Sequence, residues 1–591
     1  MEEAIALYRE ALELCPSGHP DRSSSFRYLA LCLLDRCDNQ GVVADLGEAV
    51  IRGRATLELH PTGDSNQDAS FHNLARDLRT RFREQAAVQT GLAIKLNQAV
   101  LELRPSGHSH HSSSLRNLAL CLSDRYKNRG AVADLEEAIT LGRAALELCP
   151  PGHRDRDTSL HNLARDLGTR FRKRAAMQDL DEAIKLNQAA LELRPSGHPH
   201  RSSSLCNLAL CLSDRYEIRR MVTDLKEAIK LGRAALELCP PGHRDRDTSL
   251  HNLARDLRTR FRKQAAVQDL DEAIQLNQAA LELRPSGNPH RPSSLRNLAL
   301  CLSDKYENQG VITDLEEAIT LGRAALELCP PGHSDRDVSL KNLTRNLRVR
   351  FQKEAGMQDL GELIELHREA LGLRPSGHPH RSSTLRNLAQ CLSDRYKNQG
   401  AIDDLTEAIT LGRAALDLCP PGHRDRDTSL HNLARDLGMR FRKQAAIQDL
   451  GEAIKLNQAA LELRPSGHPH RSSSLRNLAL CLSDKYEKQG VITDLEEAIR
   501  LGRAALELRP PVHSDRDESL INLARNLRMR FQKESGMQDL DEAIELHREA
   551  LGLRPTGHPH RYSSLRNLTL CLSHRYKNRG AVTDLEEAIK L

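Results

Sequence analysis

Hydrophobic residues recur along the chain with the period of an α-helix. In one representative segment, five apolar residues follow the spacing i, i+3, i+4, i+7 and i+11, which places them on one helical face. They are Leu205, Leu208, Ala209, Leu212 and Tyr216. A second kind of segment shows helical spacing between residues 180 and 191. No segment alternates apolar and polar residues as a half-buried strand would, so the pattern predicts an all-α fold.

The two kinds of segment recur together in a repeat of 45 residues. Glycines of the intervening Pro-x-Gly-His loops mark this spacing at Gly152, Gly197 and Gly242. Alternate repeats match better than neighbours, so a block of 90 residues has been duplicated. Such a period indicates a solenoid of stacked helix pairs. We expect one continuous array over residues 1–591, with both termini inside a second helix, and therefore a piece of a longer protein or a truncated gene model.

Residues with known preferences for helix ends predict where the helices begin and stop. Ser202–Ser204 and Asp157–Thr158 are expected to cap the first helix of their repeats. Asp224-Leu-Lys-Glu227 resembles a capping box for a second helix, with Asp224 as the cap. Glycines follow alternate first helices and suit a helix stop. They are Gly130, Gly310, Gly400, Gly490 and Gly580.

Composition and motifs exclude several classes of function. The 86 Lys and Arg residues nearly balance the 81 Asp and Glu residues. Neither nucleic acid nor a membrane surface is therefore an expected partner. No stretch approaches the apolar length of a membrane span and no signal peptide is present, which predicts a cytoplasmic protein. The nucleotide-binding pattern GxxxxGK[ST] is absent from the sequence, and we expect no cofactor.

Chemically capable residues occur in patterns that do not favour catalysis or metal binding. His-x-His pairs such as His198 and His200 supply two ligands, whereas zinc takes four, or three and a water. Ser, His and Asp occur together at residues 152–160, but a helix-capping loop explains them without a catalytic triad. The fourteen cysteines contain no CxxC pair and are interpreted as small core or loop residues. We expect no catalytic residue and no metal.

One part of the repeat carries the small-residue pattern of a known family. Ala183, Ala190 and Pro195 keep the spacing of the second helix of a tetratricopeptide repeat. Asn207-Leu208-Ala209 resembles the first-helix signature of that family, with Ala in place of the usual Gly. The repeat exceeds the common 34 residues by eleven, so it resembles the long variety of kinesin light chains. It is still more similar to fungal arrays that accompany caspase-like CHAT domains or nucleotide-binding switch domains.

The resemblance implies a fold and a class of function. It implies a right-handed superhelical solenoid of about thirteen antiparallel helix pairs. It also implies a non-catalytic scaffold that holds a partner peptide or protein in its concave groove. The alternative is a sensor or regulatory array of a larger CHAT or nucleotide-binding switch protein. RNA binding through a repeat code is a third hypothesis, and end-to-end self-association is a further one.

Asn precedes a Leu-Ala or Leu-Thr pair in almost every first helix, although Asn is a mediocre helix former. In the family that this chain resembles, the first helix lines the concave surface, which implies that these side chains project into a groove. An amide offers a donor and an acceptor, so it can bind the backbone of an extended peptide. A structural role between helices, or descent from recent duplication, is the alternative. The candidate peptide-binding residues are Asn117, Asn162, Asn207, Asn252, Asn297, Asn342, Asn387, Asn432, Asn477 and Asn522.

Arginines accompany these Asn residues in both kinds of repeat. In one kind an Arg immediately precedes the Asn, and the candidates are Arg296, Arg386 and Arg476. In the other kind an Arg follows three positions later on the same helical face, and the candidates are Arg165, Arg255, Arg345, Arg435 and Arg525. A groove lined by Asn and Arg is expected to prefer acidic or phosphorylated peptides. The alternative is that these arginines pair with nearby acids such as Asp166 or Asp256.

Overall fold

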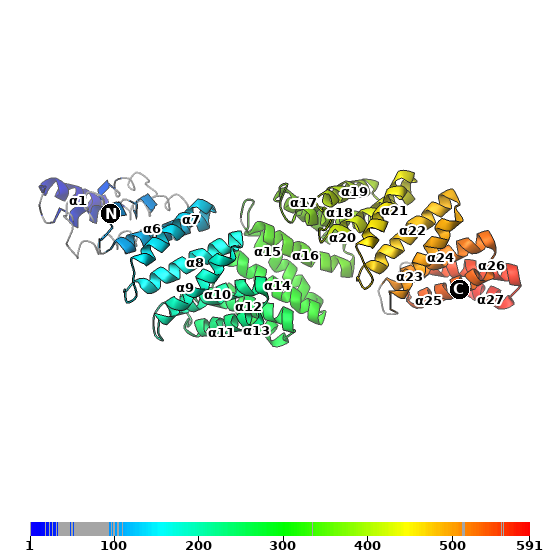
Figure 1. Ribbon diagram of the computed structural model, residues 1–591, viewed down its shortest axis with the longest axis horizontal. Helices are drawn as coiled ribbons and strands as arrows, with labels where there is room; N and C mark the ends of the chain where they lie inside the picture. Colours follow the sequence, from blue (N-terminus) through cyan, green and yellow to red (C-terminus); the bar gives the residue numbers. More distant parts are fainter. Residues whose placement is uncertain are drawn as a thin grey trace. The chain divides into compact units, whose positions relative to one another are not determined.

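A computed structural model describes residues 110–333, 335–510, 515–556 and 561–590, and before them chiefly residues 2–17. The chain divides into two compact units, Met1–Asn308 and Gln309–Leu591. Every regular element among these described residues is an α-helix, which confirms the predicted all-α fold (Figure 1).

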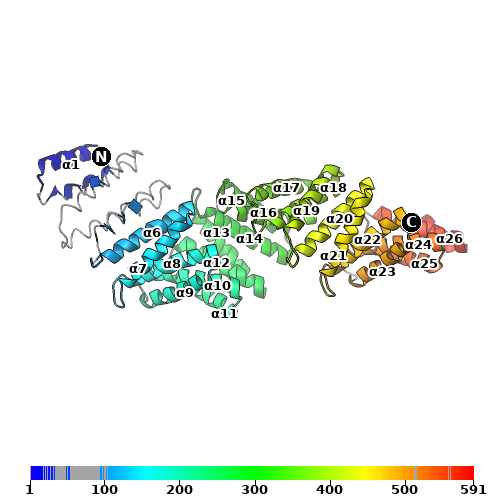
Figure 2. The same cartoon turned by 45° about the horizontal axis from the view of Figure 1, so that its top comes forward.

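Two kinds of helix alternate along the chain, and consecutive helices stack side by side within each unit (Figure 2). The first helices of the repeats are α6 (His111–Arg129), α8 (Arg156–Arg174), α10 (Arg201–Arg219), α12 (Arg246–Gln264), α14 (Arg291–Gln309), α16 (Arg336–Glu354), α18 (Arg381–Gln399), α20 (Arg426–Gln444), α22 (Arg471–Gln489), α24 (Arg516–Glu534) and α26 (Arg561–Arg579). The second helices are α1 (Glu2–Leu14), α7 (Val132–Glu147), α9 (Met177–Glu192), α11 (Val222–Glu237), α13 (Val267–Glu282), α15 (Ile312–Glu327), α17 (Met357–Gly372), α19 (Ile402–Asp417), α21 (Ile447–Glu462), α23 (Ile492–Glu507), α25 (Met537–Gly552) and α27 (Val582–Lys590).

The apolar stripes of the two helices in a repeat meet in one core. In the repeat formed by α8 and α9, Leu163, Leu167 and Phe171 are buried against Leu180 and Ala183. Burying one such side chain contributes roughly 1.5–3 kcal/mol. The same hydrophobic cluster continues into α10 and α11, so each repeat completes its core with its neighbour.

Helix starts differ from the predicted caps. The first helix α10 begins at Arg201 and α8 at Arg156, so Ser202–Ser204 and Asp157–Thr158 lie inside their helices. The second helix α11 is preceded by Met221, which makes no side-chain cap, and Asp224 lies within the first turn. The predictions of side-chain caps and of the capping box are therefore wrong.

The carboxylate of Asp224 instead joins the two helices of its repeat. Arg215 on α10 donates two hydrogen bonds to it, from Nε at 2.8 Å and from Nη2 at 2.7 Å. The same bidentate pair recurs nine residues apart in other repeats, as in Arg170–Asp179 and Arg440–Asp449. An acid in the first helical turn also suits the positive end of the helix dipole, so the position favours Asp for two reasons.

The predicted helix stops are confirmed, but six of the eleven first helices that the structure describes from residue 111 onward stop without glycine. Gly130, Gly400 and Gly490 adopt the left-handed conformation with φ between 70° and 74°. The equivalent residue of alternate repeats is often Ala, and Ala265 and Ala445 adopt φ of 54° and 57°. A residue with a Cβ pays about 1–2 kcal/mol for this conformation, whereas glycine does not.

Exchanging the two residue types between repeats is expected to change stability in opposite directions. Ala445→Gly should stabilise the end of α20 by about 1 kcal/mol, because it relieves the left-handed strain. Gly400→Ala should destabilise the end of α18 by a similar amount, since a Cβ there meets nothing within 4 Å and only the backbone strain is added. Amide hydrogen exchange in the last turns of both helices measures the effect. If both variants changed the stability of the helix end in the same direction, this explanation would be contradicted.

Candidate functional site

Successive first helices form a common surface within each unit. Besides the second helices that separate them in sequence, α8 contacts α10 and α10 contacts α12. The same holds in the second unit for α18, α20 and α22. We call the exposed side of these helices the first-helix surface. The predicted Asn and Arg residues all belong to first helices, so this surface is where a common binding role has to be tested.

The Asn residues of alternate repeats have a partner inside the protein. The amide nitrogen of Asn207 lies 3.4 Å from Nε2 of His161 on the preceding first helix, and Asn297 lies 3.3 Å from Nε2 of His251. Asn477 makes the same contact with His431 at 3.4 Å. Burial, together with the charges of Arg194 and Arg165, lowers the pKa of His161 to about 3. The imidazole is therefore neutral and its nitrogen accepts the amide hydrogen.

The Asn residues of the intervening repeats are half-buried and form no side-chain hydrogen bond with another described residue. They are Asn162, Asn252, Asn342, Asn432 and Asn522. Their spacing is 90 residues, so they present unused amides at every second first helix. Asn387 is exposed, and here Lys341 stands where other repeats carry the histidine. Asn117 is buried, with 8% of its surface exposed.

Most of the predicted arginines are paired with carboxylates. Arg165 lies 3.0 Å from Asp166, Arg255 lies 3.0 Å from Asp256, and the corresponding pair is Arg435–Asp436 at 2.8 Å. Arg386 lies 3.7 Å from Asp425, which immediately precedes α20, and Arg525 lies 2.6 Å from Glu487 on α22. Arg476 pairs with Glu518 on α24. Arg296 donates to Ser293 at 3.2 Å, and Arg345 is half-buried on α16. The geometry is that of the alternative in which these arginines pair with nearby acids, within one helix for Arg165 and between helices for Arg525.

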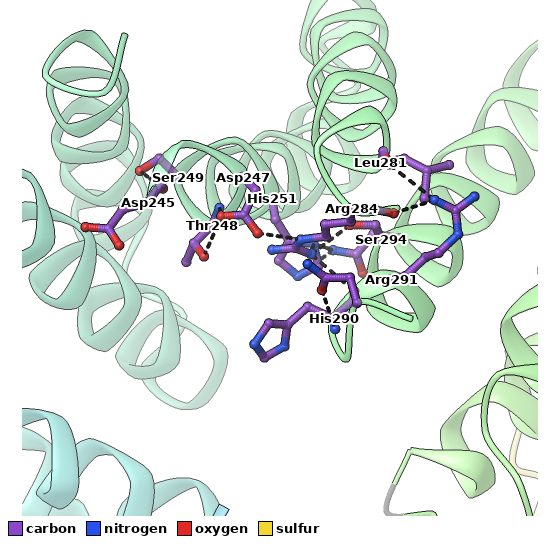
Figure 3. A network of polar contacts seen from close by, with 12 residues as sticks. Asp245, Asp247, Thr248, Ser249, His251, Leu281, Arg284, His290, Arg291 and Ser294 are labelled. Atoms are coloured by element: carbon purple, nitrogen blue, oxygen red, sulfur yellow. Dashed lines mark hydrogen bonds and ion pairs between the residues drawn. The ribbon is translucent and has the colours of Figure 1, made fainter. Parts of the chain in front are cut away.

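Sequence reasoning missed a buried arginine that joins three helices in alternate repeats. We call these residues the anchor arginines: Arg194, Arg284, Arg374, Arg464 and Arg554. Arg284 follows α13 and is 3% exposed. Its Nε donates to Asp247 on α12 at 2.8 Å, and its Nη1 donates to Ser294 on α14 at 2.7 Å and to the carbonyl of His290 at 3.3 Å (Figure 3).

A pairing rule in the sequence could have revealed this network. Wherever an anchor arginine is present, the residue 37 positions earlier is Asp, as in Arg284 with Asp247 and Arg464 with Asp427. In intervening repeats the same place usually holds a buried cysteine, and the earlier position holds an uncharged residue, Ser202 for Cys239 and Pro292 for Cys329. An anchor arginine therefore predicts an aspartate in the first helix of the same repeat.

Arg509 breaks this rule. It occupies a cysteine position, with Ser472 rather than Asp 37 residues earlier, and its side chain is fully buried. Its Nε donates to Ser472 Oγ at 3.3 Å, and the carboxylate of Asp515 lies 3.7 Å from its Nη2. Burial, together with the charge of Arg476, lowers the pKa of Arg509. A buried guanidinium without a close carboxylate is costly.

Restoring cysteine at this place is expected to stabilise the protein. Arg509→Cys should raise the free energy of unfolding by about 1–3 kcal/mol, because it removes a buried charge that lacks a close carboxylate. Arg464→Cys is the matched control and should destabilise, since Asp427 would lose its partner. Denaturant titration of the two variants distinguishes the outcomes. Destabilisation by both changes would show that the Ser472 contacts suffice for Arg509.

The comparisons with known proteins identify the repeat. A protein-family model described as "Tetratricopeptide repeat" matches residues 112–155, 158–200, 248–290, 428–470 and 518–560. These units are tetratricopeptide repeats. The prediction of the family from the spacing of Ala183, Ala190 and Pro195 is thereby confirmed.

Several solved structures are also similar to this chain. No curated protein matches the chain. The human IFIT1 dimer with PPP-AAAA is 16% identical, covers 86% of this chain and 94% of its own, and gives a TM-score of 0.40. An IFIT1 monomeric mutant with Gppp-AAAA is 14% identical over 86% of this chain and 94% of its own, with a TM-score of 0.42. A putative kinesin light chain of Podospora anserina with nearly identical TPR-like repeats is 22% identical over 38% of this chain and 100% of its own, with a TM-score of 0.28.

Two further findings concern sites of other kinds. Among the described residues, no group of three or more His, Cys, Asp or Glu side chains is arranged to hold a metal ion. No helix in the part of the chain that the structure describes is long and apolar enough to cross a membrane.

Proposed function

We propose that the tetratricopeptide array is a non-catalytic interaction scaffold that binds an extended peptide or protein segment along the first-helix surface. Helical repeats of this kind typically present extended binding surfaces assembled from many copies of one unit. The observation that carries the proposal is the set of unused, half-buried amides at Asn162, Asn252, Asn432 and their equivalents. A row of such amides suits a ligand whose own repeating feature is its backbone.

The partner that we propose is an acidic or phosphorylated segment of a protein rather than a nucleic acid or a membrane. Several candidate arginines keep part of their side chains exposed although they are paired, as Arg255 does at 34%. A paired guanidinium can still donate to a second anion through its remaining N–H groups. The role as a regulatory array of a larger CHAT or nucleotide-binding switch protein would use the same surface and stays a prediction, as does a single continuous array over residues 1–591.

Two sets of Asn variants separate binding from structure. Changing Asn162, Asn252, Asn432 and Asn522 to Ala should weaken capture of array-selected peptides at least tenfold and leave the unfolding midpoint unchanged. The matched control changes Asn207, Asn297 and Asn477 to Ala. Because it leaves half-buried histidine acceptors without their donors, it should cost about 1 kcal/mol at each position.

The peptide array should carry each sequence in neutral, acidic and phosphorylated forms, beside a single-stranded RNA titrated at several salt concentrations. Preference for the charged peptides supports an acidic partner. Tight RNA binding with a steep salt dependence would contradict the choice of a protein partner. Peptide capture that survives in the first variant set would exclude the amides as the binding surface.

A further inference from the structure

An arginine of each described alternate first helix reaches an aspartate on the next first helix, with one exception. The pairs are Arg172–Asp214 at 2.9 Å, Arg258–Asp304 at 2.6 Å, Arg348–Asp394 at 2.7 Å and Arg442–Asp484 at 2.8 Å. In every pair the aspartate stands in a Cys-Leu-Ser-Asp sequence at the middle of the helix. In each pair the negative charge of the aspartate is matched by an arginine on the neighbouring first helix.

The exception is Arg528 on α24. The position on α26 that corresponds to Asp304 and Asp394 is His574, the only replacement of this aspartate in the seven copies of the sequence. Arg528 forms no hydrogen bond or ion pair with another described residue, although its neighbours on α24 do. Its charge acts on the surroundings, because it helps burial to lower the pKa of both His574 and His547. This repeat therefore keeps the arginine of the recurring Arg–Asp pair, as Arg528, but lacks the aspartate.

Arg528 also lines a hollow of about 330 Å³ between the first helices α22 and α24. The lining is completed by Tyr486, Glu487, Met529, Gln532 and Lys533. Glu487 is engaged by Arg525 at 2.6 Å, so its charge is already neutralised. Lys533 is exposed and adds a second cation at the rim. The hollow thus combines the unpaired guanidinium of Arg528 with the Met529 side chain and the phenol ring of Tyr486.

We infer that Arg528 and this hollow bind a carboxylate side chain of a partner segment, which supplies from outside the charge that Asp304 and Asp394 supply within the chain. A carboxylate is preferred to other anions because the other repeats place that group against the equivalent arginine, where guanidinium and carboxylate match in shape and charge. The carboxylate site is one position on the proposed first-helix binding surface. The inference rests on the proposed function only in taking the carboxylate to belong to an extended partner segment.

His574→Asp is the decisive variant. It restores the aspartate of the other repeats, and the new carboxylate should occupy Arg528 and exclude the ligand. Arg528→Gly is the second variant, because Gly168 and Gly438 show that the fold accepts glycine at this position. Asp394→His is the converse variant. It removes the partner of Arg348 and should create a second site of the same chemistry in the full chain.

The probes are short blocked peptides, Ala-Ala-Asp-Ala-Ala, its Asn analogue and its phosphoserine analogue, titrated at constant ionic strength into the full chain with labelled methionine methyl groups. The methyl resonance of Met529, which lines the hollow, should shift saturably with the Asp peptide and not with the Asn peptide. Both His574→Asp and Arg528→Gly should weaken this binding at least tenfold, and Asp394→His should raise the number of bound peptides. The pKa of His574 should rise when the Asp peptide binds, because the neighbouring guanidinium is neutralised.

Three outcomes would overturn the inference. They are equal shifts with the Asp and Asn peptides, binding that is unchanged in both His574→Asp and Arg528→Gly, and saturable binding of the phosphoserine peptide alone. If the Asp peptide binds here while the Asn variants of the proposed scaffold retain all peptide capture, the carboxylate site stands and the proposed amide surface fails.

Discussion

Acidification from pH 7 to pH 5 is expected to destabilise the protein by about 2 kcal/mol for each of five buried or half-buried histidines. Burial, with nearby arginines, lowers the pKa of His161, His251 and His431 to about 3 and that of His367 and His547 to about 4. The unfolded chain binds a proton at each of these residues near pH 6.5, and the folded chain does not. The contribution is therefore complete above pH 6.5 and is lost progressively as the pH falls toward the folded-state pKa values of about 4 and about 3.

Charged groups around each histidine set the size of this effect. His161 faces Arg194, Arg165 and His200, which oppose its protonation, and Asp157, which favours it. Buried Asp256, Asp436 and Asp484 act in the opposite direction, because burial raises their pKa values and the folded state then holds their protons more tightly. These three carboxyls offset only part of the loss from five histidines.

Circular dichroism at a series of pH values measures the acid transition, and sister repeats supply the variants. His367→Asn with His547→Asn introduces the residue found at Asn187 and Asn277, and should move the acid midpoint to lower pH. His468→Asn is the control, since Asn288 fills the same loop position and accepts the same backbone hydrogen bond. If the acid midpoint is the same with and without the two buried substitutions, other groups drive the transition.

Removing the carboxylate from an anchor arginine is expected to be the most damaging single change among those considered. Asp247→Ser should lower the free energy of unfolding by about 3–5 kcal/mol, because Arg284 would stay buried without its anion. The double variant Asp247→Ser with Arg284→Cys reproduces the Ser202 and Cys239 combination of the neighbouring repeat, and should recover most of the loss.

Denaturant unfolding and hydrogen exchange across α12, α13 and α14 measure both variants. Recovery in the double variant is the result that isolates the buried charge as the cause. If the double variant is as unstable as Asp247→Ser, the loss comes from packing around residue 247 and the electrostatic explanation is wrong.

The sequence predicted the helices well because their information is local. The stripe of Leu205, Leu208 and Leu212 is repeated often enough to fix helix type and order. The αL stop at Ala445 was missed, since Ala carries no local signal for that conformation. Asp224 was mistaken for a cap because capping residues and first-turn acids have similar sequences.

The candidate site was harder to predict because its contacts join residues far apart in the chain. The partner of Asn207 is His161, 46 residues earlier, and nothing in either segment alone shows that they meet. Helical spacing placed Arg165 on the same side as the Asn residues, but its pairing with Asp166 depends on the burial of that carboxylate. The binding roles of the Asn and Arg residues stay predictions.

The anchor arginines also constrain how such a gene can change in length. Arg284 and Asp247 lie 37 residues apart in one helix pair, so gain or loss of a single 45-residue unit by unequal recombination with a breakpoint between them would set an arginine against Ser, or a cysteine against Asp. Recombination in steps of 90 residues keeps every arginine with its acid. Arg509 beside Ser472 is the kind of mismatch that a single-unit step with such a breakpoint would produce. The array can therefore lengthen or shorten without this mismatch by whole pairs of repeats, or by single units exchanged between helix pairs.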